Sequence, residues 1–164
     1  MIILGIDPGT TRIGFGVIEQ KGSKLVNQGY GCIRTEDCEL AHQKLDRIYS
    51  EVMLLINRYR PQTLVVESLF FNSNAKTAFS VGEARGVIML AAAHSGVEIA
   101  EYTPLEVKQA ITGNGRAEKN QMQQMVKMLL CLSEVPQPDD AADALAIAVC
   151  HANSRRLREL AKVK

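Results

Sequence analysis

Residues 2–9 read Ile-Ile-Leu-Gly-Ile-Asp-Pro-Gly, an apolar run that stops at an acid followed by a turn. Runs of this length and apolar character are typical of buried strands, and Asp-Pro-Gly is typical of a turn. The stretch therefore predicts a buried strand whose last residue is the carboxylate Asp7.

Two further strands are predicted directly after this turn. Residues 13–17 alternate between apolar and small or polar side chains, and the pattern runs up to a turn at Lys21-Gly22. A second alternating stretch extends from Leu25 to about Ile33. Short connections of this kind join antiparallel neighbours, so the first three strands are expected to form one antiparallel unit.

Between residues 41 and 102 helices and strands are expected to alternate. Apolar side chains recur every three or four positions from residue 41 to residue 59, which predicts a helix stopped by Pro61. The short buried strand 64–66 again ends at an acid, Glu67. A helix from about residue 75 to residue 94 and a strand over residues 97–102 follow.

The sequence pattern in the last third of the chain predicts three helices. Thr103–Glu106 combines a hydroxyl N-cap, proline at the first helical position and a capping-box glutamate, and starts a helix to about residue 111. A last helix is expected from Asp139 or Asp140 to about Arg158. The helix between them is predicted to present an inner face of Met122, Met125, Leu129 and Leu132.

These elements define an α/β fold: a five-stranded mixed sheet, with three antiparallel strands and then parallel ones, flanked by helices. We expect a single domain over residues 1–164 with a basic helical tail from about residue 155. That tail is interpreted either as a solvated face or as a binding surface. Its basic residues are Arg155, Arg156, Arg158, Lys162 and Lys164.

Composition restricts the class of protein. With 46% hydrophobic and 23% charged residues the chain has an ordinary globular composition. The longest apolar runs are far below the roughly 20 residues of a membrane span, and the amino terminus lacks a basic leader. The four cysteines form no C-x-x-C pair, so reduced thiols and a cytoplasmic location are expected. A net charge of +1 means that any nucleic-acid binding depends on a local basic patch.

Four acids are candidates for a metal site. Asp7 and Glu67 end strands, and open sheets with helices bind ligands outside the carboxyl ends of their strands. Asp140 and Asp143 are three residues apart on the final helix and share a face. Converging carboxylates favour Mg²⁺ or Mn²⁺, which are hard cations that support phosphodiester hydrolysis without a protein nucleophile.

Each acid also has a structural alternative. Asp7 can cap its turn, Glu67 can be a strand-end surface residue, and Asp139 or Asp140 can cap the last helix. Other chemistries have less support, because the chain contains neither G-x-S-x-G nor H-E-x-x-H. The three histidines are expected at solvent-facing or helix-end positions without a catalytic role; they are His42, His94 and His151.

Six sequence blocks together resemble the RuvC family of Holliday junction resolvases. They occur in that family's order, and the resemblance extends over essentially residues 1 to 155. The blocks are Gly5–Gly9, Val65–Glu67, Glu83–Val87, Val107–Gln109, Ala117–Lys119 and Asp140–Ala146.

The resemblance implies an RNase H-like fold and a homodimer that makes paired symmetric nicks in four-way junction DNA during recombination and repair. It implies RuvA and RuvB branch-migration proteins as partners, and Mg²⁺ or Mn²⁺ held by Asp7, Glu67, Asp140 and Asp143. Some relatives have histidine at the position that matches Asp140.

DNA contacts are predicted partly from the resemblance and partly from position. The family places basic residues matching Lys108 and Lys119 near DNA, and an aromatic matching Phe70 against bases. From the residues alone, Phe70 and Phe71 either stack on bases or belong to the core. Further phosphate contacts are plausible in the loops and helices that follow the acids. The predicted contact residues are Phe70, Lys76, Arg85, Lys108, Arg116 and Lys119.

Parts of the sequence are also compatible with two other functions. Residues 7–11 with Gly14 also look like the phosphate loop of actin-like ATPases and sugar kinases, but those proteins need a second loop and a second domain. A non-catalytic junction binder is the other alternative, and the presence of all four acids argues against it.

Overall fold

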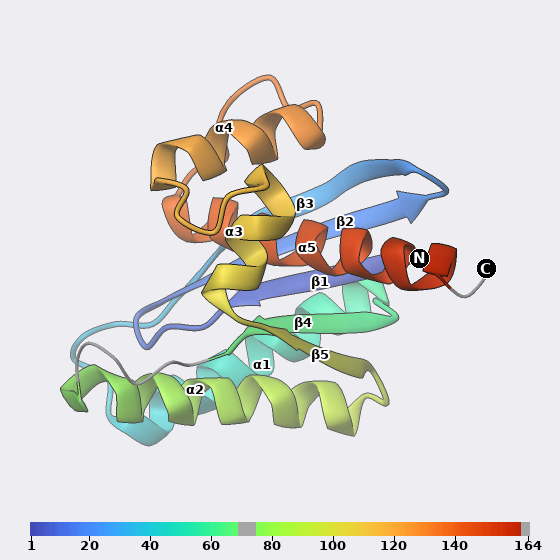
Figure 1. The fold of residues 1–164 in the computed structure, drawn as a ribbon. Helices are drawn as coiled ribbons and strands as arrows, with labels where there is room; N and C mark the ends of the chain where they lie inside the picture. The colour runs from blue at the N-terminus through green and yellow to red at the C-terminus, as the bar shows by residue number, and fades with distance from the viewer. Residues whose placement is uncertain (69–74, 162–164) are drawn as a thin grey trace.

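The computed structural model describes residues 1–68 and 75–161, and places its strands in one five-stranded sheet of order β3-β2-β1-β4-β5 (Figure 1). Strands β1, β2 and β3 are antiparallel neighbours, β4 runs parallel to β1, and β5 runs parallel to β4. The predicted mixed sheet is confirmed. The strands are β1 (Ile2–Asp7), β2 (Arg12–Lys21), β3 (Lys24–Arg34), β4 (Thr63–Glu67) and β5 (Glu98–Tyr102).

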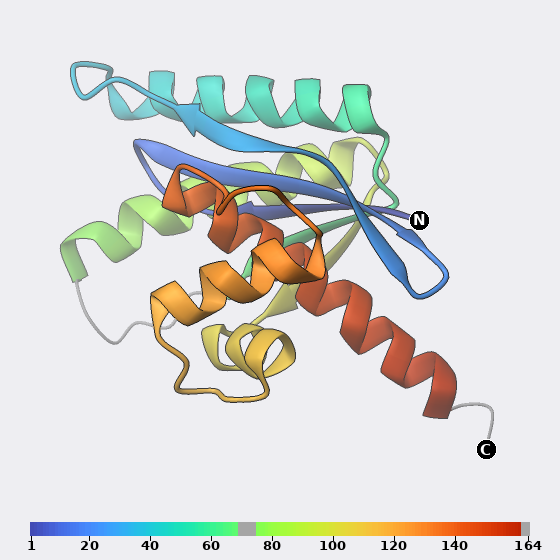
Figure 2. The same cartoon turned by 90° about the horizontal axis from the view of Figure 1, so that it is seen from above.

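Helices cover both faces of the sheet. Helices α1 and α2 lie on one face, and α5 crosses the other, with α3 and α4 packed beside it (Figures 1 and 2). The last helix continues through residue 161, slightly beyond its predicted end. The helices are α1 (Ala41–Tyr59), α2 (Ala75–His94), α3 (Pro104–Thr112), α4 (Lys119–Leu129) and α5 (Asp139–Ala161).

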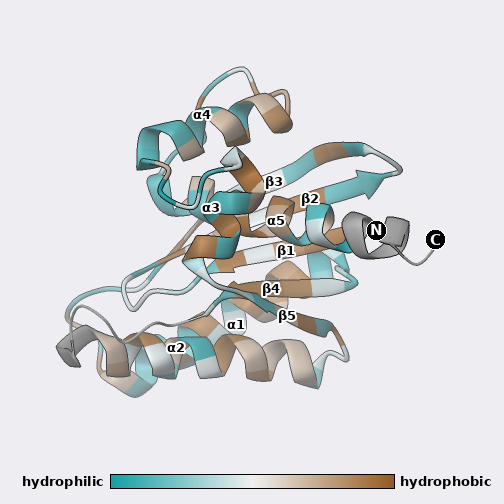
Figure 3. Cartoon of the chain, in the orientation of Figure 1, coloured by the Kyte–Doolittle hydropathy of each residue, from teal (hydrophilic) through white to brown (hydrophobic). Residues whose placement is uncertain are grey.

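Strand β1 separates two apolar cores. Ile3 packs with residues of α3, α4 and α5, whereas Leu4 and Ile6 pack with residues of α1 and α2. All three side chains are fully buried. Burial on both faces explains why the strand reads as a continuous apolar run rather than an alternating one. Figure 3 shows apolar residues gathered on the central strands.

Helix α5 lies unusually close to β1 and β2 because glycines face it. A Cβ atom on Gly5 would lie 2.2 Å from the carbonyl oxygen of Ala144, and one on Gly14 would lie 1.9 Å from that of Asp140. Gly14 is also the cross-strand partner of Asp7. The same contact therefore holds the start of α5 over the end of β1.

The predicted capping box of α3 is present. Thr103 Oγ1 accepts a hydrogen bond from the Glu106 backbone N–H at 3.1 Å, and Glu106 Oε2 accepts one from the Thr103 N–H at 2.8 Å. Thr103 is the N-cap and Pro104 is the first residue of the helix, so this local motif is confirmed.

The predicted inner face of α4 is partly wrong. Met122 is buried and Met125 packs against the core as expected, but Leu129 is exposed. Leu132 also packs against the core, although it lies beyond the end of the helix. Val126 and Leu130 provide the buried positions instead. Val126 follows Met122 by four residues, so the buried stripe is rotated relative to the predicted one.

The histidines divide into two groups. His42 is exposed, and His94 ends α2 with Nδ1 2.9 Å from the hydroxyl of Tyr49. His151 is buried, and its Nδ1 lies 3.1 Å from the hydroxyl of Tyr102. The expected exposed or helix-end position is therefore wrong for His151, which belongs to the packed interior between α5 and β5.

The four cysteines, Cys32, Cys38, Cys131 and Cys150, form no disulfide. Over residues 1–68 and 75–161, no helix combines the length and apolar character needed to cross a membrane.

The glycine contact generates a stability prediction. Gly14→Ala should lower the free energy of unfolding by about 1 to 3 kcal/mol, because α5 must move off the strand. Gly86→Ala is the control, since its Cβ would meet nothing within 4 Å on the exposed side of α2. It should be neutral or stabilise by up to about 1 kcal/mol. Urea unfolding measures both, and a neutral Gly14→Ala would contradict the close packing.

Candidate active site

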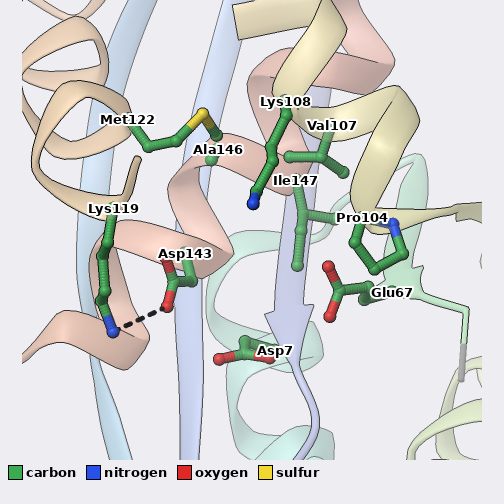
Figure 4. A pocket seen from close by; sticks show the side chains of 10 residues that line it. All are labelled: Asp7, Glu67, Pro104, Val107, Lys108, Lys119, Met122, Asp143, Ala146 and Ile147. Carbon is green, nitrogen blue, oxygen red and sulfur yellow. Dashed lines mark ion pairs between the residues drawn. The ribbon is translucent and has the colours of Figure 1, made fainter. Parts of the chain in front are cut away.

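A pocket of about 250 Å³ lies at the carboxyl ends of β1 and β4, below α3, α4 and α5 (Figure 4). Charged side chains line one part of it and apolar side chains from the helices line the rest. The lining residues are Asp7, Glu67, Pro104, Val107, Lys108, Lys119, Met122, Asp143, Ala146 and Ile147.

Three of the four predicted metal ligands meet in this pocket. Asp7 is the last residue of β1 and Glu67 is the last residue of β4, and these strands are parallel neighbours. Asp143 comes from the start of α5, which the glycine contacts hold over β1 and β2. Figure 4 shows the three carboxylates around one space.

The fourth predicted ligand, Asp140, does not line the pocket. Its Oδ2 lies 2.7 Å from Nη2 of Arg12, the first residue of β2. Among the described residues, no group of three or more histidine, cysteine, aspartate or glutamate side chains is arranged closely enough to hold a metal ion. Three of the four carboxylates therefore meet in the pocket, and the fourth, that of Asp140, pairs with Arg12 outside it.

Burial and mutual repulsion raise the pKa values of the pocket acids. Burial, followed by the negative charges of Asp143 and Glu67, raises the pKa of Asp7 to about 8. Burial and Asp143 also raise the pKa of Glu67, against the opposing charge of Lys108. Ionised carboxylates so placed repel one another unless a cation lies between them. The donor set therefore fits a hard divalent cation.

Lys119 partly supplies this positive charge. Its Nζ lies 3.2 Å from Asp139 Oδ2 and 3.5 Å from Asp143 Oδ2. Burial nevertheless raises the pKa of Asp143, and Lys119 only partly opposes that effect. Lys119 thus links the first residue of α4 to the start of α5 and to the pocket.

The side chain of Asp139 contacts α4, which differs from the alternative in which it caps the last helix. Asp139 is the first residue of α5 rather than the residue before it, and its carboxylate points toward α4. Gln123 Nε2 donates a hydrogen bond to Asp139 Oδ1 at 2.9 Å, and the hydrogen bonds from Lys119 and Gln123 lower the pKa of Asp139. Asp139 therefore connects two helices.

The predicted DNA contacts lie in different settings. Lys108 and Lys119 line the pocket, and Arg116 is exposed in the loop between α3 and α4. Arg85 instead forms an ion pair with Glu101 of β5, and only a fifth of its side chain is exposed. Its guanidinium is already engaged within the fold.

Two predicted residues are less fully described. Lys76 belongs to the first turn of α2. Phe70, like Phe71, lies outside the described residues.

Sequence reasoning missed Arg12. Its only sequence signal is a basic residue in the turn region after Asp7, and surface arginines are too common for that signal to select it. The partner is distant in the chain, so only the packing of α5 on β2 reveals the pair.

The fold and the carboxylate pocket define the chain as an RNase H-like nuclease. The family model for "Crossover junction endodeoxyribonuclease RuvC" matches residues 3–151. A protein of that description from Moorella thermoacetica is 55% identical over 162 residues, which cover 99% of this chain and 97% of the relative. The chain belongs to the RuvC family of crossover junction endodeoxyribonucleases.

Solved structures agree with this assignment. The Thermus thermophilus RuvC structure superposes with a TM-score of 0.88 at 39% identity and covers 96% of each chain. T. thermophilus RuvC in complex with a Holliday junction substrate gives the same TM-score at 36% identity, again with 96% of each chain covered. The family match favours the nuclease over the ATPase interpretation of residues 7–11.

The raised pKa of Asp7 predicts how stability depends on pH without metal. The carboxyl group ordinarily titrates near 3.8 but titrates near 8 in the folded chain, so its ionisation opposes folding. The stability of the folded chain that comes from keeping this carboxyl group protonated is fully present below pH 3.8 and is lost as the pH rises toward 8. Asp7→Asn should therefore stabilise the protein in EDTA by about 2 kcal/mol or more at pH 8, and by much less near pH 4.

Thermal unfolding at several pH values measures this difference. Asp46→Asn is the control, because Asp46 is exposed on α1, on the opposite face of the sheet. The control should show no such trend. A difference between wild type and Asp7→Asn that is constant with pH would contradict the electrostatic account.

Proposed function

We propose that this chain resolves four-way Holliday junctions by paired symmetric nicks during recombination and DNA repair. The observation that carries the proposal is the meeting of Asp7, Glu67 and Asp143 in one pocket of a RuvC-family fold. A family relative from T. thermophilus has been solved with a Holliday junction substrate. The proposed substrate is accordingly four-way junction DNA.

The proposed cofactor is Mg²⁺, with Mn²⁺ able to substitute. Asp7, Glu67 and Asp143 would hold it, and Asp140 would join them after leaving Arg12. When bound, the ion supplies a Lewis acid that activates water and stabilises charge on the leaving oxygen. Support comes from the buried, mutually repelling carboxylates, which need a counter-charge that Lys119 provides only in part.

The other pocket residues have supporting roles. Lys108 points into the pocket, and its positive charge partly opposes the rise in the pKa of Glu67 that burial and Asp143 cause (Figure 4). Its ammonium group is placed to meet a phosphate of the DNA backbone, as is that of Lys119 once it leaves Asp143. Val107, Met122 and Ile147 form the apolar part of the pocket lining.

Contacts farther from the pocket belong to the same proposal. Arg116 and Lys76 are proposed to meet phosphates outside the cleavage site, and Phe70 to stack on bases at the junction. Arg85 is a weaker candidate, because reaching DNA would require it to leave Glu101.

We propose that the chain acts as a cytoplasmic homodimer with RuvA and RuvB as partners, each subunit being one domain. A two-fold dimer matches the two-fold symmetry of the junction and brings one pocket to each of two strands. Exposed apolar side chains on α2, including Phe79 and Leu90, are compatible with a protein contact.

Substitution of the pocket acids tests the proposed function. Asp7→Asn and Glu67→Gln should each reduce Mg²⁺-dependent cutting of a synthetic four-way junction by at least about 100-fold, because each removes a charged metal ligand. Junction affinity in EDTA, measured by gel shift, should be nearly unchanged. Asp46→Asn should cut normally. Near wild-type cutting by either pocket variant would refute the proposed site.

Phosphate binding by the two pocket lysines gives a separate prediction. Lys108→Ala or Lys119→Ala should weaken junction binding and reduce the slope of log affinity against log salt by roughly 0.9, the value for one lost phosphate contact. Lys24→Ala is the control, since this exposed lysine begins β3 in the β2–β3 hairpin. An unchanged slope with a lower melting temperature would indicate a structural role.

A further inference from the structure

In the function proposed so far, Arg12 has no role beyond being the partner that Asp140 leaves. About half of the Arg12 side chain and just over a quarter of the Asp140 side chain are exposed. Arg12 is also absent from the pocket lining, although it stands only five residues after Asp7.

The backbone fixes this pairing. Arg12 and Gly14 are two residues apart on β2 and therefore project from the same face of the strand. Gly14 brings the backbone of Asp140 into direct contact with that face. The side chain of Arg12 consequently emerges beside the carboxylate of Asp140. The position of this ion pair is therefore determined by the strand register and by the packing of the helix on the strand.

The pair also conflicts with metal binding. Asp140 Oδ2 faces the guanidinium of Arg12, and the carboxylate lies outside the pocket that contains the three other acids. Either cation can neutralise this carboxylate, but while the carboxylate stays beside Arg12 it lies outside the pocket. Binding of a metal by all four acids therefore requires the Asp140 side chain to turn from Arg12 toward the pocket.

We propose that Arg12 is a positioning residue that competes with the divalent metal for Asp140 and thereby sets the metal affinity of the site. This inference rests on the proposed metal-dependent function. In the absence of metal, Arg12 holds Asp140 outside the pocket and reduces the negative charge around Asp7. In the loaded site, Asp140 exchanges the guanidinium for the metal, and Arg12 is released toward solvent beside the pocket.

Lys119 has a comparable place beside Asp143 but is a less suitable test, because it is also a proposed phosphate contact. Arg12→Gln removes the charge while keeping a long polar side chain. Arg34→Gln is a matched control, since exposed Arg34 is the cross-strand partner of Arg12 on β3 and gives the same change in net charge.

The competition can be measured directly by titrating the full chain with Mn²⁺ in the absence of DNA and monitoring binding by electron paramagnetic resonance. Arg12→Gln should bind Mn²⁺ about two- to fivefold more tightly than wild type, the range expected for a lost competing ion pair of this exposure. Arg34→Gln should match wild type. In an Asp140→Asn background, Arg12→Gln should have no further effect. The Mg²⁺ concentration that gives half-maximal junction cutting should fall in parallel.

Other results would overturn the inference in distinguishable ways. Wild-type protein that binds no Mn²⁺ would refute the proposed metal site, and the inference with it. Mn²⁺ binding that is equal in wild type and Arg12→Gln would refute the competition alone. Weaker junction binding by Arg12→Gln in EDTA, with unchanged Mn²⁺ affinity, would make Arg12 a phosphate contact instead. An effect that persists in the Asp140→Asn background would assign it to net charge.

Discussion

The contact between the backbone of α5 and the glycines of β1 and β2 is the constraint on which the site depends. A methyl group at Gly5 or Gly14 would overlap a carbonyl oxygen of the helix, so the helix can lie at this depth only where the strands carry no side chain. Gly14 is the cross-strand partner of Asp7. Close packing therefore brings acids from the two ends of the chain to one place before any ligand is present.

This placement has an electrostatic cost. Carboxylates that are buried near one another favour their protonated forms, as the raised pKa of Asp7 shows. Arg12 and Lys119 reduce the cost by pairing with Asp140 and Asp143. These two cations pair with Asp140 and Asp143, and Lys108 only partly offsets the rise in the pKa of Glu67. The negative charge of the pocket acids is therefore only partly neutralised, and a divalent cation would supply the remaining positive charge.

The sheet and the strand-end acids could be predicted because their signals are local, and the spacing on the last helix also indicated Asp143, which lines the pocket. A buried strand that ends on a carboxylate is visible within a few residues, as at Asp7 and Glu67, and the Thr103 capping box is equally short. The buried face of α4 was harder to predict from the sequence, because Met125 and Val126 are both apolar. Only tertiary packing shows that Val126 is the buried one. The pairing of Arg12 with Asp140 was out of reach, since it depends on how deeply a glycine lets α5 approach β2.

Spacing alone left the roles of Asp139, Asp140 and Asp143 open, because all three lie near one face of a helix. In the folded chain they diverge: Asp139 contacts α4, Asp140 contacts β2, and Asp143 enters the pocket. The helix backbone beneath them cannot shift toward the strands without meeting Gly14. Rotation of an aspartate side chain can accommodate a change in cation without any movement of the helix toward the strands. Rotation of a single aspartate is a small change, so the same rigid scaffold can support both the lysine- and arginine-paired arrangement and a metal-loaded one.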